Sequence, residues 1–367
     1  MALQRHLRST VEETSIMQSR QEPWVIRTML SVPGHIERLI QKGAKSKADC
    51  VMLDLQDAVP PESKTEARTT IRRALDSGLL DHKIVMVRLN HLDTGRTQQD
   101  VDTVACEQLN GFVYPMANTA QEIEAVDAML ARQEIALGLA KGHFSIIVLV
   151  ETPLGVINAY PLAKASGRVV GLLFGAEDFV VEMEARPDAE QLVLHTPRAL
   201  IALAAKAAGV EAIDTPYVQV HDLDGLEAHA NRGRSLGMSG MLVISPRQIP
   251  IARAVYTPSQ EEVQEAQQVL RLMDEARREG RPAGRPYAIR DGKLVAPSRE
   301  KQARRVLLRA AADRNLDLRS SQPPAPQSAD VAESADKTSA PSAQSADSAD
   351  VADGYRSAQS ADSGVQR

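Results

Sequence analysis

The stretch IIVLVETPLGVINA, residues 146–159, joins a continuous apolar run to Glu151, Thr152, Pro153 and Gly155. A run of this kind is typical of a parallel β-strand that is covered on both faces. A carboxylate that follows such a strand directly is costly to desolvate unless a cation accompanies it. The stretch therefore predicts a buried strand that ends at an acid with a cationic partner or a metal ion.

Seven further runs along the chain have the same apolar, β-rich character, and helix-compatible segments such as 62–75 and 198–209 separate them. Together with 145–152, the expected strands are 28–34, 50–58, 83–90, 111–116, 169–178, 212–218 and 240–246. Eight strand-then-helix units predict an α/β protein built as a (β/α)₈ TIM barrel. A doubly wound open sheet is the competing topology, because the number of units alone does not exclude it.

The composition limits the class of protein. The chain has 367 residues, 43% of them hydrophobic, with a formal net charge of −5 and two cysteines. A barrel of about 250 residues with extensions accounts for the length. The net charge argues against general nucleic-acid binding, and the cysteines form neither a disulfide framework nor a zinc motif. Without an apolar run of about 18 residues, we expect a soluble, cytoplasmic protein with no nucleic-acid or membrane partner.

The ends of the chain differ from its middle. We expect a polar N-terminal arm over residues 1–22, the barrel over 23–256 and a C-terminal helical and lid extension over 257–319. Residues 320–367 repeat Ser-Ala-Asp with Pro and Gln and contain almost no large apolar side chain. Such a composition does not bury enough surface to offset the entropy of ordering, so we expect a disordered tail.

Polar side chains follow several of the expected strands, at the ends where TIM barrels carry their active sites. These residues are Asp54, Asp57, Arg88, Asn90, Glu151, Glu177 and Asp178. Each one alone is also compatible with a loop cap or a solvated charge. Carboxylates that converge on one barrel mouth repel each other unless a cation is present, and oxygen ligands without a His or Cys cluster favour Mg²⁺. The pattern predicts a Mg²⁺ site in which Glu151 is a ligand.

Six ordered motifs stand at the expected strands: RTMLSVPG (27–34), MLDLQDAVPPESKTEAR (52–68), VRLN (87–90), VETPLGV (150–156), GAEDF (175–179) and SPRQI (245–249). Together they resemble the citrate lyase β-subunit and malyl-CoA lyase family, within the HpcH/HpaI aldolase group, over residues from about 24 to about 312. The resemblance implies a (β/α)₈ barrel that forms trimers or hexamers. It also implies Mg²⁺-dependent cleavage or formation of a carbon–carbon bond between an acyl-thioester enolate and a carbonyl compound.

The resemblance also implies roles for single residues. Glu151 and Asp178 match the two metal-binding carboxylates, and Arg88 matches the catalytic arginine that holds a substrate carboxylate or the developing enolate oxygen. An arginine suits that place because it stays charged. The substrate-binding residues implied beside Arg88 are Arg27, Asp54, Asp57, Gly175, Ala176 and Glu177. Backbone amides of residues 175–177 are expected to approach a substrate oxygen.

Several positions depart from the family pattern. Gln56 replaces an acid, Met116 and Met241 replace lysines, and Ser245 replaces a histidine, which makes the expected mouth less basic and more apolar. Ala296 stands where many lyases of the family carry an acid/base aspartate on a lid that reaches a neighbouring subunit. Asp291 is an alternative acid, although an aspartate before Gly292 is also typical of a solvated turn.

The sequence thus predicts a divergent Mg²⁺-dependent carbon–carbon lyase or aldolase. Its expected substrate is a 3-hydroxyacyl thioester of the citryl-, malyl- or citramalyl-CoA type, split into an acyl-thioester and an oxo acid. Its expected assembly is a homo-oligomer. Two alternatives remain open: a non-catalytic or weakly active paralogue that binds a ligand, and an aldolase that acts on free hydroxy-oxo acids.

Overall fold

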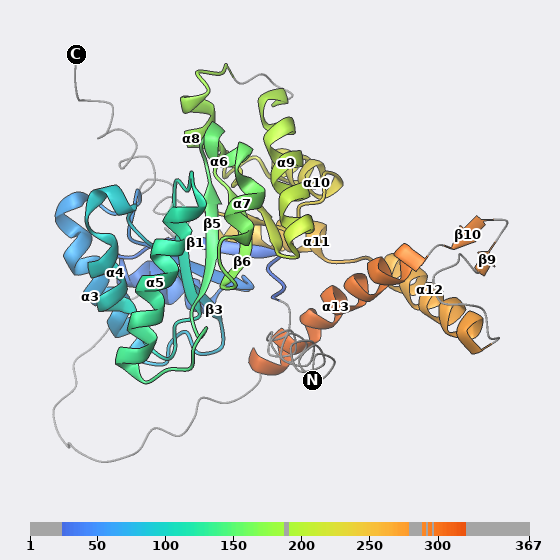
Figure 1. The fold of residues 1–367 in the computed structure, drawn as a ribbon, viewed down its shortest axis with the longest axis horizontal. Helices are drawn as coiled ribbons and strands as arrows, with labels where there is room; N and C mark the ends of the chain where they lie inside the picture. Colours follow the sequence, from blue (N-terminus) through green and yellow to red (C-terminus); the bar gives the residue numbers. More distant parts are fainter. Residues whose placement is uncertain (1–23, 187–190, 279–287, 291–292, 296, 321–367) are drawn as a thin grey trace, which may run out of the picture.

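The eight expected strands form one closed parallel barrel in sequence order, with the last strand paired to the first (Figure 1). The computed structural model describes residues 24–186, 191–278, 288–290, 293–295 and 297–320. The strands are β1 Thr28–Pro33, β2 Cys50–Asp54, β3 Ile84–Arg88, β4 Gly111–Tyr114, β5 Ser145–Val150, β6 Val169–Phe174, β7 Glu211–Asp214 and β8 Gly240–Val243. Closure excludes the open sheet and confirms the TIM barrel.

The strands end earlier than the sequence predicts, because polar side chains at their carboxyl ends turn the chain out of the sheet. The clearest case is β2, expected to run to residue 58. There the carboxylate of Asp54 accepts hydrogen bonds from the backbone N–H groups of Gln56 at 2.8 Å and Ala58 at 3.0 Å. These amides are therefore withdrawn from the ladder with β3.

Helices cover the outside of the barrel (Figure 1). They are α2 Glu37–Lys45, η1 Pro61–Ser63, α3 Lys64–Asp76, η2 Leu92–Thr94, α4 Thr97–Val104, α5 Ala120–Leu137, α6 Pro153–Ile157, α7 Ala159–Lys164, α8 Ala176–Glu182, α9 Leu192–Ala208, α10 Leu223–Ser235, η3 Pro246–Gln248 and α11 Ile249–Tyr256. Alternate strand residues face these helices or the barrel interior, as the strand period of two requires. Two buried clusters result, one between strands and helices and one inside the barrel.

The barrel interior is a packed core and not a pore. Met29, Met52, Met86 and Ile147 fill it and are 0% exposed. Trp24, just before β1, is partly buried and packs against the same cluster. Because the interior is closed below, a ligand can enter only at the carboxyl ends of the strands.

A helical extension follows the barrel and projects to one side of it (Figure 1). It consists of α12 Gln260–Arg278, an antiparallel hairpin of β9 Ala288–Arg290 and β10 Lys293–Val295, and α13 Pro297–Ser320. Arg309 of α13 donates to Glu211 at 3.0 Å and so ties the extension to the amino end of β7. Within the described part of the chain, no helix is both long enough and apolar enough to span a membrane. The expected N-terminal arm and tail lie outside the described residues.

Candidate active site

Glu151 directly follows β5 and is 2% exposed. Its Oε1 accepts a hydrogen bond from the backbone N–H of Met116 at 2.8 Å, and Met116 stands in the left-handed region with φ 48°. The next residue, Thr152, caps α6 by accepting from the N–H of Gly155 at 2.9 Å. The motif that begins with Glu151 therefore encodes a strand end and a helix start, and it leaves the carboxylate at the barrel mouth.

Gly175, which follows β6, lies against Glu151. A Cβ atom at this position would come within 2.6 Å of Glu151 Oε2 and 2.7 Å of its Cβ. No side chain fits there, so the glycine is needed for close approach and not only for a turn. Its position lets α8 begin beside Glu151, and the first turn of that helix carries Glu177 and Asp178, both exposed.

The two predicted metal carboxylates are thus brought together, and their charges interact. Burial raises the pKa of Glu151 well above its ordinary value, and the charges of Asp178 and Asp57 raise it further, against the opposing effect of Arg88. Burial also raises the pKa of Asp57, which Arg88 counteracts. The mouth therefore holds more carboxylate charge than its arginine compensates, which favours a bound cation.

Arg88, the last residue of β3, is 4% exposed and is held by two aspartates. Its Nε donates to Asp54 Oδ1 at 2.7 Å and its Nη2 to Asp54 Oδ2 at 2.5 Å. Its Nη1 lies 3.1 Å from Asp57 Oδ2, whose side chain is 53% exposed. Asp54 is 0% exposed, so its role is to orient Arg88, while Asp57 reaches the solvent side of the mouth.

Arg27 is placed wrongly by the substrate-binding prediction. It precedes β1, at the amino end of the barrel, where its Nη2 donates to Asp49 Oδ1 at 2.7 Å and its Nη1 to Thr257 Oγ1 at 3.1 Å. The side chain is 0% exposed. Arg27 is therefore separated from the mouth by the packed interior.

Two other expectations also need correction. The amides of Gly175 and Ala176 are already engaged, because they donate to Val150 O and to Thr215 Oγ1, both at 3.0 Å. They are not available to a substrate oxygen in this arrangement. Met241 belongs to the cluster between strands and helices, so it does not make the mouth more apolar. Met116, at 36% exposure, does lie on the mouth side.

Sequence reasoning missed two supports of the site. Lys64 of α3 donates to the backbone carbonyls of Leu55 at 2.9 Å and Gln56 at 2.8 Å, and so holds the loop that carries Asp57. Thr215, one residue after β7, holds the start of α8 through the N–H of Ala176. Neither residue type is unusual in its local sequence, so no signal distinguished them.

The arrangement fits Mg²⁺ better than a transition metal. Among the described residues, no group of three or more His, Cys, Asp or Glu side chains is close enough to hold a metal ion. Mg²⁺ commonly binds through one or two carboxylates and completes its shell with water and substrate oxygens, whereas structural zinc needs four protein ligands. Glu151 and Asp178 are the residues that would hold it.

A TIM barrel whose mouth combines these acids with a buried arginine has the architecture of a metal-assisted enzyme. The family model described as HpcH/HpaI aldolase/citrate lyase matches residues 27–246. The chain belongs to this family, as its motifs indicate.

Individual relatives cover most of the chain. A (3S)-malyl-CoA thioesterase of Cereibacter sphaeroides is 32% identical over 78% of this chain and 95% of its own length. A citrate lyase subunit beta of Haemophilus influenzae is 32% identical over 77% of this chain and 96% of its own. Among solved structures, protein CitE of Mycobacterium tuberculosis in complex with magnesium, acetoacetate and coenzyme A is similar with a TM-score of 0.61 and 27% identity. That match covers 78% of this chain and 98% of the CitE chain.

Proposed function

We propose that the protein is a Mg²⁺-dependent carbon–carbon lyase that splits a 3-hydroxyacyl-CoA thioester into an acyl-thioester and an oxo acid. The observation that carries the proposal is the buried carboxylate of Glu151, which lies beside further acids at the barrel mouth. A relative with bound magnesium, acetoacetate and coenzyme A supports the choice of metal and substrate class.

The residues of the chain divide the work as follows. Glu151 and Asp178 would hold the metal ion, and Mg²⁺ when bound supplies Lewis-acid polarisation of substrate oxygens. Arg88, kept in position by Asp54, binds the carboxylate of the oxo-acid half or the oxygen that becomes negative. Asp57 is half-exposed beside Arg88 and closes the entrance.

The acid/base for the hydroxyl proton is the open part of the proposal. Ala296 and Asp291 lie outside the described residues. We expect Ala296→Asp to raise the rate of malyl- or citramalyl-CoA cleavage by about 10²–10⁴-fold, because a positioned acid/base is typically worth that much. Full turnover in the parent, with no gain in the variant, would show that another group transfers the proton.

A second candidate activity is thioester hydrolysis, which the name of the Cereibacter sphaeroides relative favours. The products separate the two reactions, because a lyase releases an oxo acid and an acyl-CoA, whereas a thioesterase releases free coenzyme A and a hydroxy acid. We therefore propose a product analysis of malyl-CoA turnover with Mg²⁺, with Glu151→Gln as the inactive control. Oxo acid as the first product supports the lyase. Absence of both reactions, with ligand still bound, favours the non-catalytic alternative. Turnover of free hydroxy-oxo acids in place of the thioester favours the remaining one.

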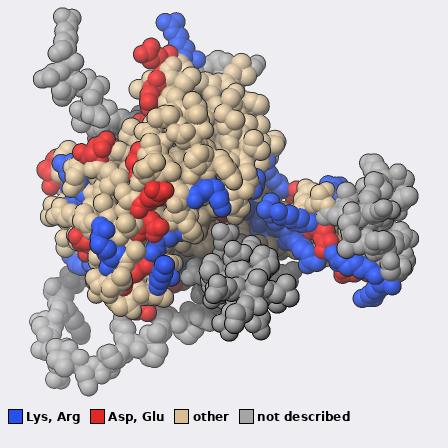
Figure 2. Space-filling view, in the orientation of Figure 1, with Lys and Arg blue, Asp and Glu red and all other residues tan. Residues whose placement is uncertain are grey.

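We further propose that copies of the chain associate through the outer face of α6, α7 and α9. Figure 2 shows a broad uncharged surface over these helices. Its exposed apolar residues are Leu154, Ile157, Tyr160, Leu200 and Leu203. A contiguous patch of this kind is unusual on a monomer, and Ile157 is 76% exposed. Ile157→Glu should lower the mass measured by light scattering, whereas Ile135→Glu, at an 81% exposed position on α5, should not.

A further inference from the structure

Ser31 of β1 is a buried hydroxyl close to the mouth, and the mechanism above does not use it. It is 2% exposed, and its Oγ has no hydrogen-bond partner among the described residues. Its neighbours Leu30 and Val32 belong to the cluster between strands and helices, whereas Met29 belongs to the interior cluster. Because successive side chains of a strand alternate between faces, Ser31 faces the barrel interior, as Met29 does.

The strand register places Ser31 directly below the charged residues of the site. Ser31 pairs with Met52, which pairs with Met86, so these three form one row across β1, β2 and β3. The next inward-facing row toward the mouth contains Asp54 and Arg88. Rows two residues apart are separated by about 6–7 Å. Ser31 therefore stands where the apolar interior meets the polar mouth.

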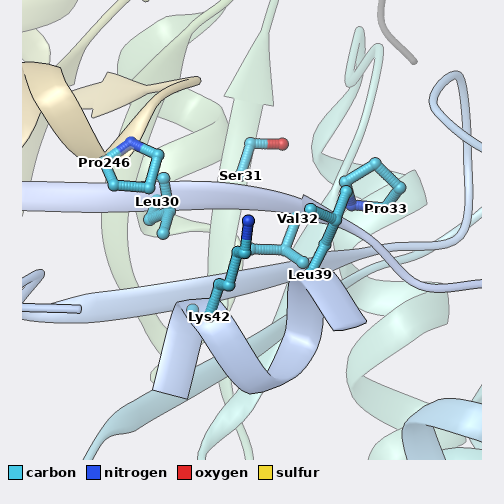
Figure 3. A pocket seen from close by; sticks show the side chains of 8 residues that line it. Leu30, Ser31, Val32, Pro33, Leu39, Lys42 and Pro246 are labelled. Atoms are coloured by element: carbon cyan, nitrogen blue, oxygen red, sulfur yellow. The ribbon is translucent and has the colours of Figure 1, made fainter. Parts of the chain in front are cut away.

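Figure 3 shows the same orientation, with the Ser31 hydroxyl on the opposite side of β1 from Lys42 and Leu39. A small gap of about 20 Å³ lies on that outer side, between β1, α2 and Pro246. It has room for about one water molecule. This gap is separate from the mouth, and the Ser31 hydroxyl points away from it.

A buried hydroxyl without a partner costs the folded protein free energy, because it has lost its hydrogen bonds to water. An alanine would avoid that cost in the same space. We propose that the bound ligand supplies the missing partner, so that Ser31 is a specificity-determining residue that donates a hydrogen bond to an oxygen at the buried end of the ligand. This proposal rests on the proposed function, since it places the oxo acid in the same mouth.

The surroundings define the ligand end that Ser31 takes. Met29, Met52 and Met86 below it are 0% exposed, so the floor of the site does not admit a long chain. The group that reaches Ser31 is compact and carries an oxygen, as the carboxylate or carbonyl of a short oxo acid does. Because the hydroxyl is covered in the ligand-free protein, it meets the ligand in a bound form in which the side chains above it have moved.

The experiment compares two buried serines at opposite ends of the barrel. Ser239, just before β8, is 6% exposed, and its Oγ donates to Ala212 O at 3.0 Å and accepts from Ala212 N at 2.9 Å. Ser31→Ala should raise the melting temperature of the ligand-free protein by about 2 °C or more, since an unpaired polar group is removed. Ser239→Ala should lower it, because two hydrogen bonds are lost.

Ligand affinity should change in the opposite sense. With Mg²⁺ present and pyruvate as the probe in calorimetry, Ser31→Ala should bind about 5- to 10-fold more weakly, the loss of one hydrogen bond. Ser239→Ala should bind as the parent does. Equal pyruvate affinity in Ser31→Ala and the parent would overturn the role of Ser31 and leave the proposed function standing. A parent protein that does not bind pyruvate with Mg²⁺ would overturn both.

Discussion

The two ends of β2 carry the same ion pair in different surroundings. Asp49, just before the strand, holds Arg27 through Nε at 3.1 Å and Nη2 at 2.7 Å. Asp54, at the end of the strand, holds Arg88 through the same two atoms at 2.7 and 2.5 Å. Both pairs are almost fully buried, and both join neighbouring strands of the barrel. Geometry and burial alone do not tell them apart.

The difference lies in the charges around each pair. At the amino end, Arg253 adds a second cation 3.9 Å from Asp49. At the mouth, Asp57 and the carboxylates that raise the pKa of Glu151 add negative charge. Paired charges that balance locally serve the fold, whereas a surplus of one sign that persists after burial needs a ligand. The comparison shows that an arginine–aspartate pair marks a site only when its neighbours leave charge uncompensated.

The largest effect is expected from the metal carboxylate itself. Glu151→Gln should weaken Mg²⁺ binding by more than about 100-fold and abolish metal-dependent turnover, because ligand loss costs more than the loss of a supporting contact. Calorimetric titration with Mg²⁺ measures this. Glu134→Gln is the matched control, since Glu134 is also 2% exposed but is bound to Arg168 and to two backbone amides. It should lower stability and leave Mg²⁺ affinity unchanged. Equal Mg²⁺ affinity in Glu151→Gln and the parent would contradict the assignment.

Breaking each arginine pair tests the comparison directly. Asp49→Asn and Asp54→Asn should each cost about 3–5 kcal/mol of stability, because each leaves a buried guanidinium without its counter-charge. Only Asp54→Asn should also reduce turnover of the folded protein, by about 100-fold, since Arg88 loses its orientation. Denaturant unfolding and steady-state kinetics below the melting temperature separate the two outcomes. A comparable fall in turnover in Asp49→Asn would remove the distinction between the two ends.

A smaller effect is expected at Gly175. In Gly175→Ala the new Cβ would lie 2.6 Å from Glu151 Oε2, so the carboxylate must move. Mg²⁺ affinity should fall by about 10- to 100-fold, as for other changes that misplace a ligand. Gly138→Ala provides a control at a glycine with nothing within 4 Å and a positive φ of 67°, where strain affects stability but not the metal. Unchanged Mg²⁺ affinity in Gly175→Ala would show that Glu151 has room to adjust.

The smallest effect concerns a third buried arginine pair, Arg198–Asp214, with His229 beside it. Burial, and then the charge of Arg198, lowers the pKa of His229 to about 3. Since the unfolded chain takes up this proton below about pH 6.5, the stabilisation is complete above that pH and is lost as pH falls toward 3. Between pH 7.5 and 5.5 the parent should lose about 1.4 kcal/mol more than His229→Gln in urea unfolding. Equal losses would show that His229 is protonated in the folded state.

Much of the fold and part of the site follow from the sequence. The apolar runs marked eight buried strands, and the carboxyl ends of parallel strands meet at one face, so Glu151, Arg88 and Asp178 were expected to lie together. The motif GAED was read as a turn with acids after it, which agrees with the start of α8. Strand direction alone also puts Arg27 at the amino end. Its assignment to the substrate came from its place in a motif, which contains residues from both ends of a strand.

Only the tertiary structure decided how the polar groups are shared. The amide of Ala176 was expected to face the substrate, but Thr215, 39 residues later, accepts its hydrogen bond. Arg27 is bound by Asp49 and Thr257, which is 230 residues away. The unpartnered hydroxyl of Ser31 has no local signature, because a partner is present or absent only once the neighbouring strands are in register. The sequence by itself determined where strands end and which residues stand there, since periodicity and strand direction are local. Which of those groups remain unsatisfied depends on contacts between distant segments, and so the closed barrel decided it.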